Sequence, residues 1–218
     1  MMALTHGAVS VAIAALALPM LGDSAGPAVL AAALVGGIAP DLDVVAAHRK
    51  TLHYPVGFTL LTGLLLGGTL LVPTTALVLA AVAVGAAALH AWSDAFAGSV
   101  EREPWNPTTE RAVYNHALGR WHRPRRYVRY SGAPEDFLLA LAAAAVGIVS
   151  SATGPTADAG LLCLVAVAGG YTLLRRTLGT LPSRVAGLVP ARLVRHLPTV
   201  RVVETDSGAT TLCVSRRR

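Results

Sequence analysis

Charge is scarce in this sequence of 218 residues, and cysteine is nearly absent. Charged residues make up 14% of the chain, against about 25% in soluble domains, and 54% of the chain is hydrophobic. With a mean hydropathy of +0.57, the composition predicts a membrane protein with one compact domain. The two cysteines, Cys163 and Cys213, exclude a disulfide framework and a cysteine-based zinc site. Any bound metal would therefore use histidine and carboxylate side chains.

The N-terminus lacks the basic region that precedes the apolar core of a secretory signal peptide, and His6 stands there instead. We therefore expect the first apolar run to be a membrane helix that stays in the protein. Hydropathy and turn residues divide the chain into six apolar segments, several of them nearer fifteen than twenty residues long. The segments are 7–21, 25–39, 55–72, 75–92, 137–153 and 159–174.

Helix is the expected state of every segment, because lipid offers no partner for open backbone polar groups. The expected fold is all-α: a polytopic membrane helical bundle with about five to six short transmembrane helices. The first two segments can also form one broken span across Gly22–Gly26. A membrane-embedded domain would cover 1–175, with a cytoplasmic loop over 95–135, and a basic cytoplasmic tail would cover 176–218.

Lysine is almost missing, since seventeen arginines accompany a single lysine. In a six-span topology, the turns at 22–25, 73–75 and 154–158 contain none of these eighteen basic residues. The positive-inside rule then assigns the other side to the cytoplasm and makes this a multi-pass protein of the cell membrane. The net charge of +6 needs no nucleic acid to explain it, and membrane lipids are the expected partners. No feature of the sequence specifies an oligomeric state.

The 95–135 loop mixes arginine with tryptophan and tyrosine. Its Pro-Thr-Thr-Glu stretch predicts a short helix over 107–120. The loop is open to two interpretations, an interfacial lid that contacts anionic lipid headgroups or a solvated loop with interfacial aromatic residues. In the tail, alternating apolar residues around Asp-Ser-Gly at 206–208 predict a β-hairpin.

Seven histidine and aspartate residues gather at the ends of the apolar segments. In the six-span topology they all lie at the cytoplasmic face. They are His6, Asp41, Asp43, His48, His53, His90 and Asp94. Charges near hydrocarbon are costly, at about 2.5–3.5 kcal/mol for a carboxylate at the centre of a membrane helix. Such a concentration of costly groups predicts a metal site.

His90 and Asp94 are four residues apart and therefore share one helix face. Such a pair can bind one divalent ion through a nitrogen and an oxygen, and Zn or Mn suits these donors. Asp41 and Asp43 follow Pro40, where an extended turn would let both carboxylates reach a metal. In the simpler alternative, one aspartate caps a helix, and a histidine at the interface is only hydrogen-bonded.

Several motifs occur in a specific order. They are Thr-His-Gly at 5–7, Gly-x-x-x-Pro-Asp-Leu-Asp at 36–43, His-Arg at 48–49, His53, His-x-x-x-Asp-x-x-x-Gly at 90–98 and Pro-Trp-Asn-Pro at 104–107. The set resembles the YdjM-like family of inner-membrane proteins, which are described as metal-dependent hydrolases. More distantly, the order resembles the ligand order of zinc-dependent phospholipase C and P1-type nucleases, in which ions bridged by a carboxylate cleave phosphoesters.

The phospholipase resemblance implies a set of metal ligands. They are His6, Asp43, His53, His90 and Asp94. The phospholipase-type fold carries further ligands after the His-x-x-x-Asp motif, and His116 and His122 are the residues of this chain that could correspond to them. Asp41 is expected as a further ligand or as the general base, and His48 as an acid or as support for a ligand. Arg49 would contact a substrate phosphate.

The function expected is a membrane-bound metal-dependent hydrolase with one or two divalent ions. Its substrate would be a phosphoester or a lipid-like molecule, small or amphiphilic, reached at the cytoplasmic membrane face. One alternative is a non-catalytic membrane scaffold with a structural metal or none. The other is a small transporter, which would place ionisable groups at the membrane midplane rather than at segment ends.

Overall fold

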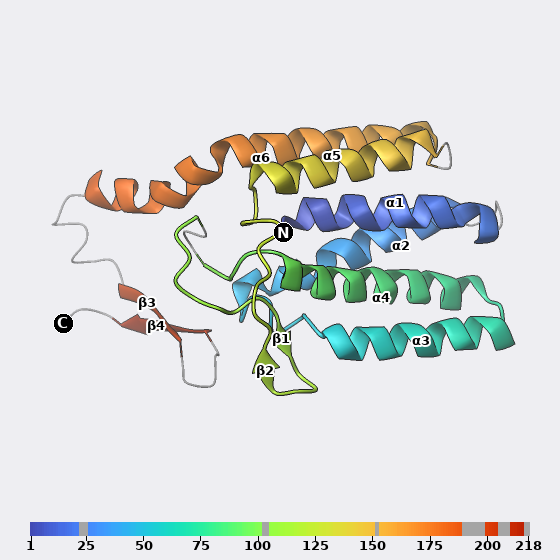
Figure 1. Cartoon of the computed structure of the whole chain (residues 1–218), viewed down its shortest axis with the longest axis horizontal. Helices are drawn as coiled ribbons and strands as arrows, with labels where there is room; N and C mark the ends of the chain where they lie inside the picture. Colours follow the sequence, from blue (N-terminus) through green and yellow to red (C-terminus); the bar gives the residue numbers. More distant parts are fainter. Residues whose placement is uncertain (22–25, 102–104, 151–152, 189–198, 205–209, 216–218) are drawn as a thin grey trace.

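The computed structural model describes residues 1–21, 26–101, 105–150, 153–188, 199–204 and 210–215. Within these residues the chain forms six α-helices whose axes run side by side (Figure 1). They are α1 (Ala3–Leu21), α2 (Gly26–Ile38), α3 (Pro55–Leu71), α4 (Thr75–Ser93), α5 (Pro134–Val149) and α6 (Gly154–Leu188). Each of them covers one of the six expected segments, so the prediction of a mostly helical chain is confirmed.

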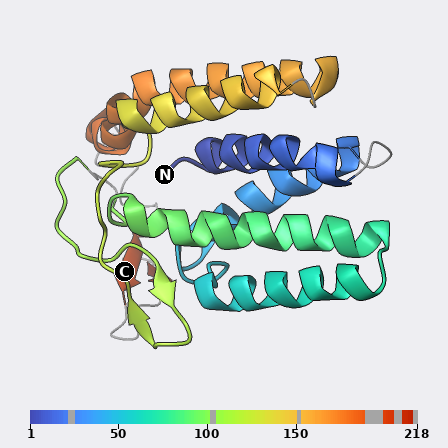
Figure 2. The same ribbon diagram turned by 45° about the vertical axis from the view of Figure 1, so that its right-hand side comes forward.

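The helices form a layered bundle whose spatial order differs from the chain order. α1 lies against α2 and α5, α2 also lies against α4, α3 packs on α4, and α6 packs on α5. Figures 1 and 2 show the α5–α6 pair on one side, α1 and α2 in the middle, and α4 and α3 on the other side. Because α1 and α2 pack against each other, the first two segments form two helices rather than one broken span.

Among the described residues, four helical stretches are long and apolar enough to cross a membrane. They are Ala3–Met20, Gly26–Val45, Thr75–Phe96 and Gly154–Gly179. α3 is a shorter apolar helix of 17 residues, and its outer side chains are also apolar, with Leu64 and Leu70 well exposed. Long apolar helices with apolar outer surfaces indicate a membrane protein.

The last helix is longer than expected, since α6 runs to Leu188 although the apolar segment ends at 174. Arg175 and Arg176 end the hydrophobic run, but arginine is a good helix former and does not end the helix. Hydropathy therefore marks the apolar part of α6 and misses its polar continuation.

Glycine lets α2 approach its neighbours closely near its C-terminal end. A Cβ atom on Gly36 would overlap the carbonyl group of Ala83 in α4. A Cβ atom on Gly37 would lie 2.6 Å from Ser10 Oγ and 2.8 Å from the carbonyl oxygen of His6, both in α1. These two glycines bring the backbones of three helices together immediately before the Asp41 segment.

Both α2 and α4 continue into short 3₁₀-helices at the same end of the bundle. η2 (Ala39–Val45) follows α2, and η3 (Asp94–Phe96) follows α4. Pro40 lies in the first turn of η2. It costs no hydrogen bond there, because the N–H groups of the first turn of a helix have no partner within the helix in any case. The tighter winding of η2 buries Pro40 and Asp43 and leaves Leu42 and Val44 on the outside.

A hairpin occupies the place of the helix expected over 107–120, so that prediction is wrong. β1 (Tyr114–Asn115) pairs antiparallel with β2 (Arg120–Trp121). Asn115 Oδ1 accepts hydrogen bonds from the backbone N–H groups of Ala117 and Leu118, at 3.0 and 3.1 Å. Gly119 then takes a φ of +61°, which favours glycine. Asparagine and glycine thus favour a turn over a helix at this point.

The predicted hairpin of the tail is confirmed. β3 (Thr199–Glu204) pairs antiparallel with β4 (Thr210–Ser215), and Thr199 lies opposite Ser215. The Asp-Ser-Gly stretch and the terminal arginines lie outside the described residues.

Replacing Gly36 with alanine is expected to destabilise the bundle, because the added methyl group would overlap the backbone of α4. Overpacking of this kind costs about 1–3 kcal/mol. Thermal unfolding of the full chain in detergent measures the effect. Gly63→Ala in α3 is the matched control, since a Cβ there meets nothing within 4 Å. Equal melting temperatures for the two variants would contradict the close α2–α4 packing.

Candidate metal centre

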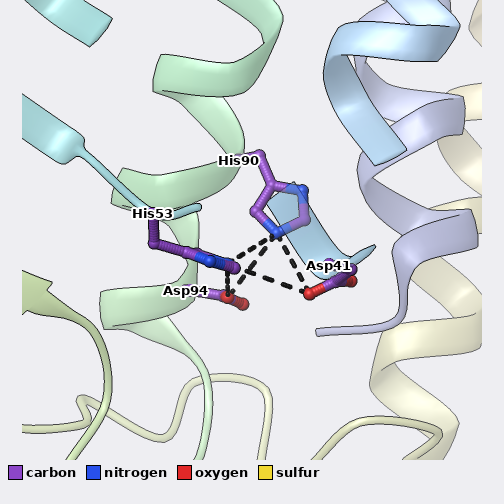
Figure 3. A group of neighbouring side chains, drawn as sticks. All are labelled: Asp41, His53, His90 and Asp94. Carbon is purple, nitrogen blue, oxygen red and sulfur yellow. Dashed lines mark hydrogen bonds and ion pairs between the residues drawn. The ribbon is translucent and has the colours of Figure 1, made fainter. Parts of the chain in front are cut away.

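Four side chains from three parts of the chain meet at the end of the bundle where α2 and α4 finish. Asp41 comes from η2, His53 from the stretch before α3, and His90 and Asp94 from the end of α4 and the start of η3. Figure 3 shows their polar ends pointing toward one another. One ligand atom from each lies within 4.8 Å of the other three. This group can hold a metal ion.

The donor atoms are two imidazole nitrogens and two carboxylate oxygens. The Nε2 atoms of His53 and His90 lie 3.2 Å apart. Asp41 Oδ1 is 3.4 Å from His90 Nε2 and 3.8 Å from His53 Nε2. Asp94 Oδ2 is 3.3 Å from His53 Nε2 and 3.7 Å from His90 Nε2. A mixed set of nitrogen and oxygen donors suits zinc and manganese.

The ring of His90 is oriented by a backbone carbonyl group. Its Nδ1 lies 2.7 Å from the carbonyl oxygen of Gly37, which can only accept a hydrogen bond. The proton of the neutral ring is therefore on Nδ1, and the lone pair of Nε2 faces the centre. Metal-binding histidines are commonly held in this way by a second polar partner.

His53 is oriented by a carboxylate. Its Nδ1 lies 2.9 Å from Asp43 Oδ2, and its Nε2 faces His90 and Asp94. Burial alone lowers the pKa of His53, but the carboxylates of Asp43 and Asp94 outweigh it and raise the pKa to about 9. In the metal-free chain His53 therefore carries two protons near pH 7, and a bound cation would replace the one on Nε2.

Asp43 is not a member of the group of four, but contacts His53 on the Nδ1 side of its ring. Its Oδ1 lies 2.8 Å from His48 Nδ1 and accepts the Arg49 backbone N–H at 3.2 Å. Its Oδ2 accepts the Leu52 backbone N–H and faces His53 Nδ1. Asp43 therefore fixes the chain around 48–53, and His48 is linked to the centre through Asp43 and through an edge-to-face contact with the His53 ring, with centroids 5.9 Å apart.

Asp94 has one oxygen without a hydrogen bond. Its Oδ2 is 3.1 Å from Arg49 Nε as an ion pair, but neither atom is hydrogen-bonded within the described part of the chain. The Arg49 side chain instead donates from Nη1 to the carbonyl oxygen of Gly98 at 2.6 Å. A buried carboxylate oxygen usually has a partner, and a metal ion would supply one here. The donor set therefore fits a divalent cation.

His6 lies beside the group of four. Its Nε2 is 3.2 Å from Asp94 Oδ1, and its ring stacks on that of His90 with centroids 3.6 Å apart. Ser93 Oγ donates to the carbonyl oxygen of His90 and lies 3.1 Å from His6 Nδ1. The N-terminal ammonium group of Met1 also contacts Asp94 Oδ1, at 2.9 Å.

Of the six expected metal ligands, the group thus contains four, while Asp43 contacts His53 and His6 contacts both Asp94 and His90. His116 and His122 lie elsewhere: His116 contacts the carbonyl oxygen of Lys50, and His122 contacts Asn115. Sequence reasoning missed the contribution of Gly37 and Ser93. The Gly36-Gly37 pair indicates close packing, but a sequence motif does not show which backbone carbonyl group accepts a hydrogen bond from a histidine.

Comparison of the chain with protein-family models, with curated proteins and with solved structures gave no match.

Asp43→Asn is expected to weaken metal binding by about 10–100-fold, because it removes the charge that orients His53. Competition with a chelating dye for Zn²⁺ or Mn²⁺ measures the affinity. Glu110→Gln is the control, since Glu110 pairs with Arg126 at the surface and contacts no member of the group. An unchanged affinity in Asp43→Asn would mean that His53 does not bind the ion.

The metal-free protein is expected to lose stability as the pH rises from about 6.5 to about 9. The raised pKa of His53 stabilises the fold fully below 6.5, and this contribution disappears as the ring loses its proton in the folded state. Melting temperatures of chelator-treated protein at pH 6.5 and pH 9 test this. The difference should shrink in His53→Gln, and a persistent difference would assign it to another group.

Proposed function

We propose that the protein is a membrane-bound metal-dependent hydrolase that acts on a phosphoester or lipid-like substrate at the cytoplasmic membrane face. The observation that carries the proposal is the convergence of Asp41, His53, His90 and Asp94 at one end of an apolar helical bundle. Four metal-binding side chains are costly to bury in such a protein without a cation to balance them.

A bound divalent ion would supply an acidified water and a Lewis acid for the phosphoryl oxygen. His53 and His90 would hold it through Nε2, and Asp41 and Asp94 through one oxygen each. Asp41 also suits the role of general base, because its side chain is 16% exposed while the other three show no exposed side-chain surface. A partly exposed carboxylate can accept a proton and pass it to solvent.

His48 and Arg49 would act next to the ion. The His48 side chain is 30% exposed and is held by Asp43, which suits an acid that protonates a leaving group. Arg49 neutralises Asp94 and is almost fully buried. We propose that its guanidinium group also faces the substrate phosphate, since an arginine can serve a carboxylate and a phosphate with different N–H groups.

Zinc or manganese is the proposed metal, with one ion in the group of four. A second ion would use the space between His6 Nε2 and Asp94 Oδ1, which face each other at 3.2 Å. Asp94 would then contribute a ligand atom to each ion, and two ions together would stabilise the attacking and the leaving oxygen of a phosphoester. The resemblance to zinc-dependent phospholipase C and P1-type nucleases supports more than one ion at such a site.

The proposed orientation places this end of the bundle in the cytoplasm. The turn at 73–75 lies at the opposite end (Figure 1) and has no basic residue. The segments around the site include the arginine-rich 95–135 loop. The positive-inside rule therefore supports a cytoplasmic site.

A structural metal site is the second candidate. His53, His90 and Asp94 are almost completely buried, and closed coordination is typical of metals that only stabilise a fold. A transporter has less support, because the ionisable group lies where helices end rather than near the middle of the spans.

Metal content of the detergent-purified full chain tests the proposal. We expect one or two zinc or manganese ions per chain by elemental mass spectrometry, and loss of the metal in the His90→Ala/Asp94→Ala double variant, because it removes two of four ligands. His116→Ala is the control, as a histidine outside the group. Metal-free wild type that also fails to take up added ions would overturn the proposal.

Asp41→Asn separates a catalytic from a structural ion. In a hydrolase with saturating Zn²⁺ or Mn²⁺, we expect this variant to keep the fold and to hold the ion through the three other ligands, but to lose at least about 100-fold in turnover of chromogenic phosphomonoesters and phosphodiesters. If the metal is only structural, wild type shows no turnover, and Asp41→Asn changes the melting temperature alone.

A further inference from the structure

A polar cavity of about 320 Å³ lies beside the metal centre. Its walls come from η2, from the stretch that follows it, from the loop after η3 and from α6. Arg49 and His48 form part of one wall, and Arg175 of α6 forms part of another. The cavity thus combines residues of the metal-binding half of the chain with a helix that carries no metal-binding motif.

Two short chains of contacts connect this cavity with the centre. Arg49 lines the cavity and is ion-paired with Asp94. His48 also lines it and contacts Asp43, which orients His53. A group bound in the cavity would therefore be separated from Asp94 by Arg49 alone, and from His53 by His48 and Asp43.

Arg175 is held in a fixed position. Its Nε donates to the carbonyl oxygen of Ser131 at 3.1 Å, and its guanidinium carbon lies 5.2 Å from the ring centroid of Trp105 and 5.8 Å from that of Tyr171. Gly132 makes this approach possible, because its φ is +84° and a Cβ there would lie 2.7 Å from the Tyr171 ring. An arginine stacked between rings is already ordered, so less entropy is lost when it binds an anion.

The cavity wall also includes the carboxylate of Glu101. Glu101 accepts hydrogen bonds from the Ser99 hydroxyl and from the backbone N–H groups of Thr108 and Thr109, at 2.7–2.8 Å. Its oxygens are therefore occupied in closing the 101–109 loop. Arg49 and Arg175 are the arginines that line the cavity.

We propose that this cavity binds a phosphate-type oxyanion and that Arg175 is a specificity-determining residue. The proposal rests on the proposed function, because it assigns the substrate's anionic group to the space next to the metal. Arginine is suited to such recognition, since its planar N–H groups match phosphate oxygens in pairs. The volume accommodates a phosphate and a small substituent.

One wall indicates where the rest of such a molecule would lie. Val44 lines the cavity, is 68% exposed and belongs to the candidate span Gly26–Val45. An apolar substituent could therefore leave the cavity along η2 toward the lipid. The shared chemistry is the phosphate, and its source is either a lipid headgroup or a soluble phosphoester.

The test compares Arg175→Gln with Arg176→Gln in the full chain purified in detergent. The two arginines are adjacent on α6, but Arg176 does not line the cavity. Binding of inorganic phosphate and of dispersed phosphatidic acid is measured by calorimetry, on both metal-loaded and chelator-treated protein. We expect Arg175→Gln to lose about tenfold or more in affinity, as for a charge-assisted hydrogen bond, and Arg176→Gln to stay within about twofold.

The outcomes are distinct. Tighter binding of phosphatidic acid than of phosphate identifies a lipid headgroup, and equal binding identifies a soluble phosphoester; both support the cavity. Equal losses in the two glutamine variants, or none in Arg175→Gln, would overturn the inference. The proposed function is judged separately, by metal content and turnover of the wild type. If Arg175→Gln fails to fold, Arg175→Lys takes its place and must lose affinity. A wild type that binds phosphate through Arg175 but never binds metal contradicts only the proposed function.

Discussion

The burial of carboxylate charge is the constraint on which this end of the molecule depends. Asp43 and Asp94 are almost wholly buried, and a buried carboxylate is costly unless charged or hydrogen-bonding groups surround it. The partners come from distant parts of the chain: His53 and Arg49 from the stretch before α3, and His6 from α1. The arrangement of α1, α2 and α4 at this end therefore provides partners for the buried carboxylates in addition to packing the helices together.

The site consequently has an inner and an outer part with different chemistry. The inner group of four is mostly buried and can hold a cation. The outer cavity is polar and carries two arginines. Asp43 and Arg49 belong to both, since each contacts the inner group and a wall of the cavity. The proposed anion site would lie next to the candidate cation site, and such an arrangement suits phosphoester hydrolysis.

The sequence predicted the parts of this structure that local patterns encode. Hydropathy located six helices, and the four-residue spacing of His90 and Asp94 placed both at one helix end. Asp43 was expected as a ligand, but it contacts His53 Nδ1 instead. This position depends on how the chain turns at 44–52, which cannot be predicted from the spacing of residues in the sequence. The hairpin at Asn115 was missed because the Pro-Thr-Thr-Glu stretch before it indicates a helix, whereas the turn depends on the Asn115 side chain and on the positive φ of Gly119. The anchoring of Arg175 by Trp105 and Gly132 arises from contacts between distant segments, which have no local signature.

The way in which α2 and α4 both finish at the centre has an electrostatic consequence of its own. The backbone dipoles of a helix add up to about half an elementary negative charge at its C-terminal end. Two such ends meet here, and the buried carbonyl group of Gly37 accepts a hydrogen bond from His90 Nδ1. The backbone thus attracts cations to this point before any carboxylate is counted. Uptake of a metal would then be an exchange of one positive charge for another. The proton on His53 Nε2 would leave, and the metal ion would take its place.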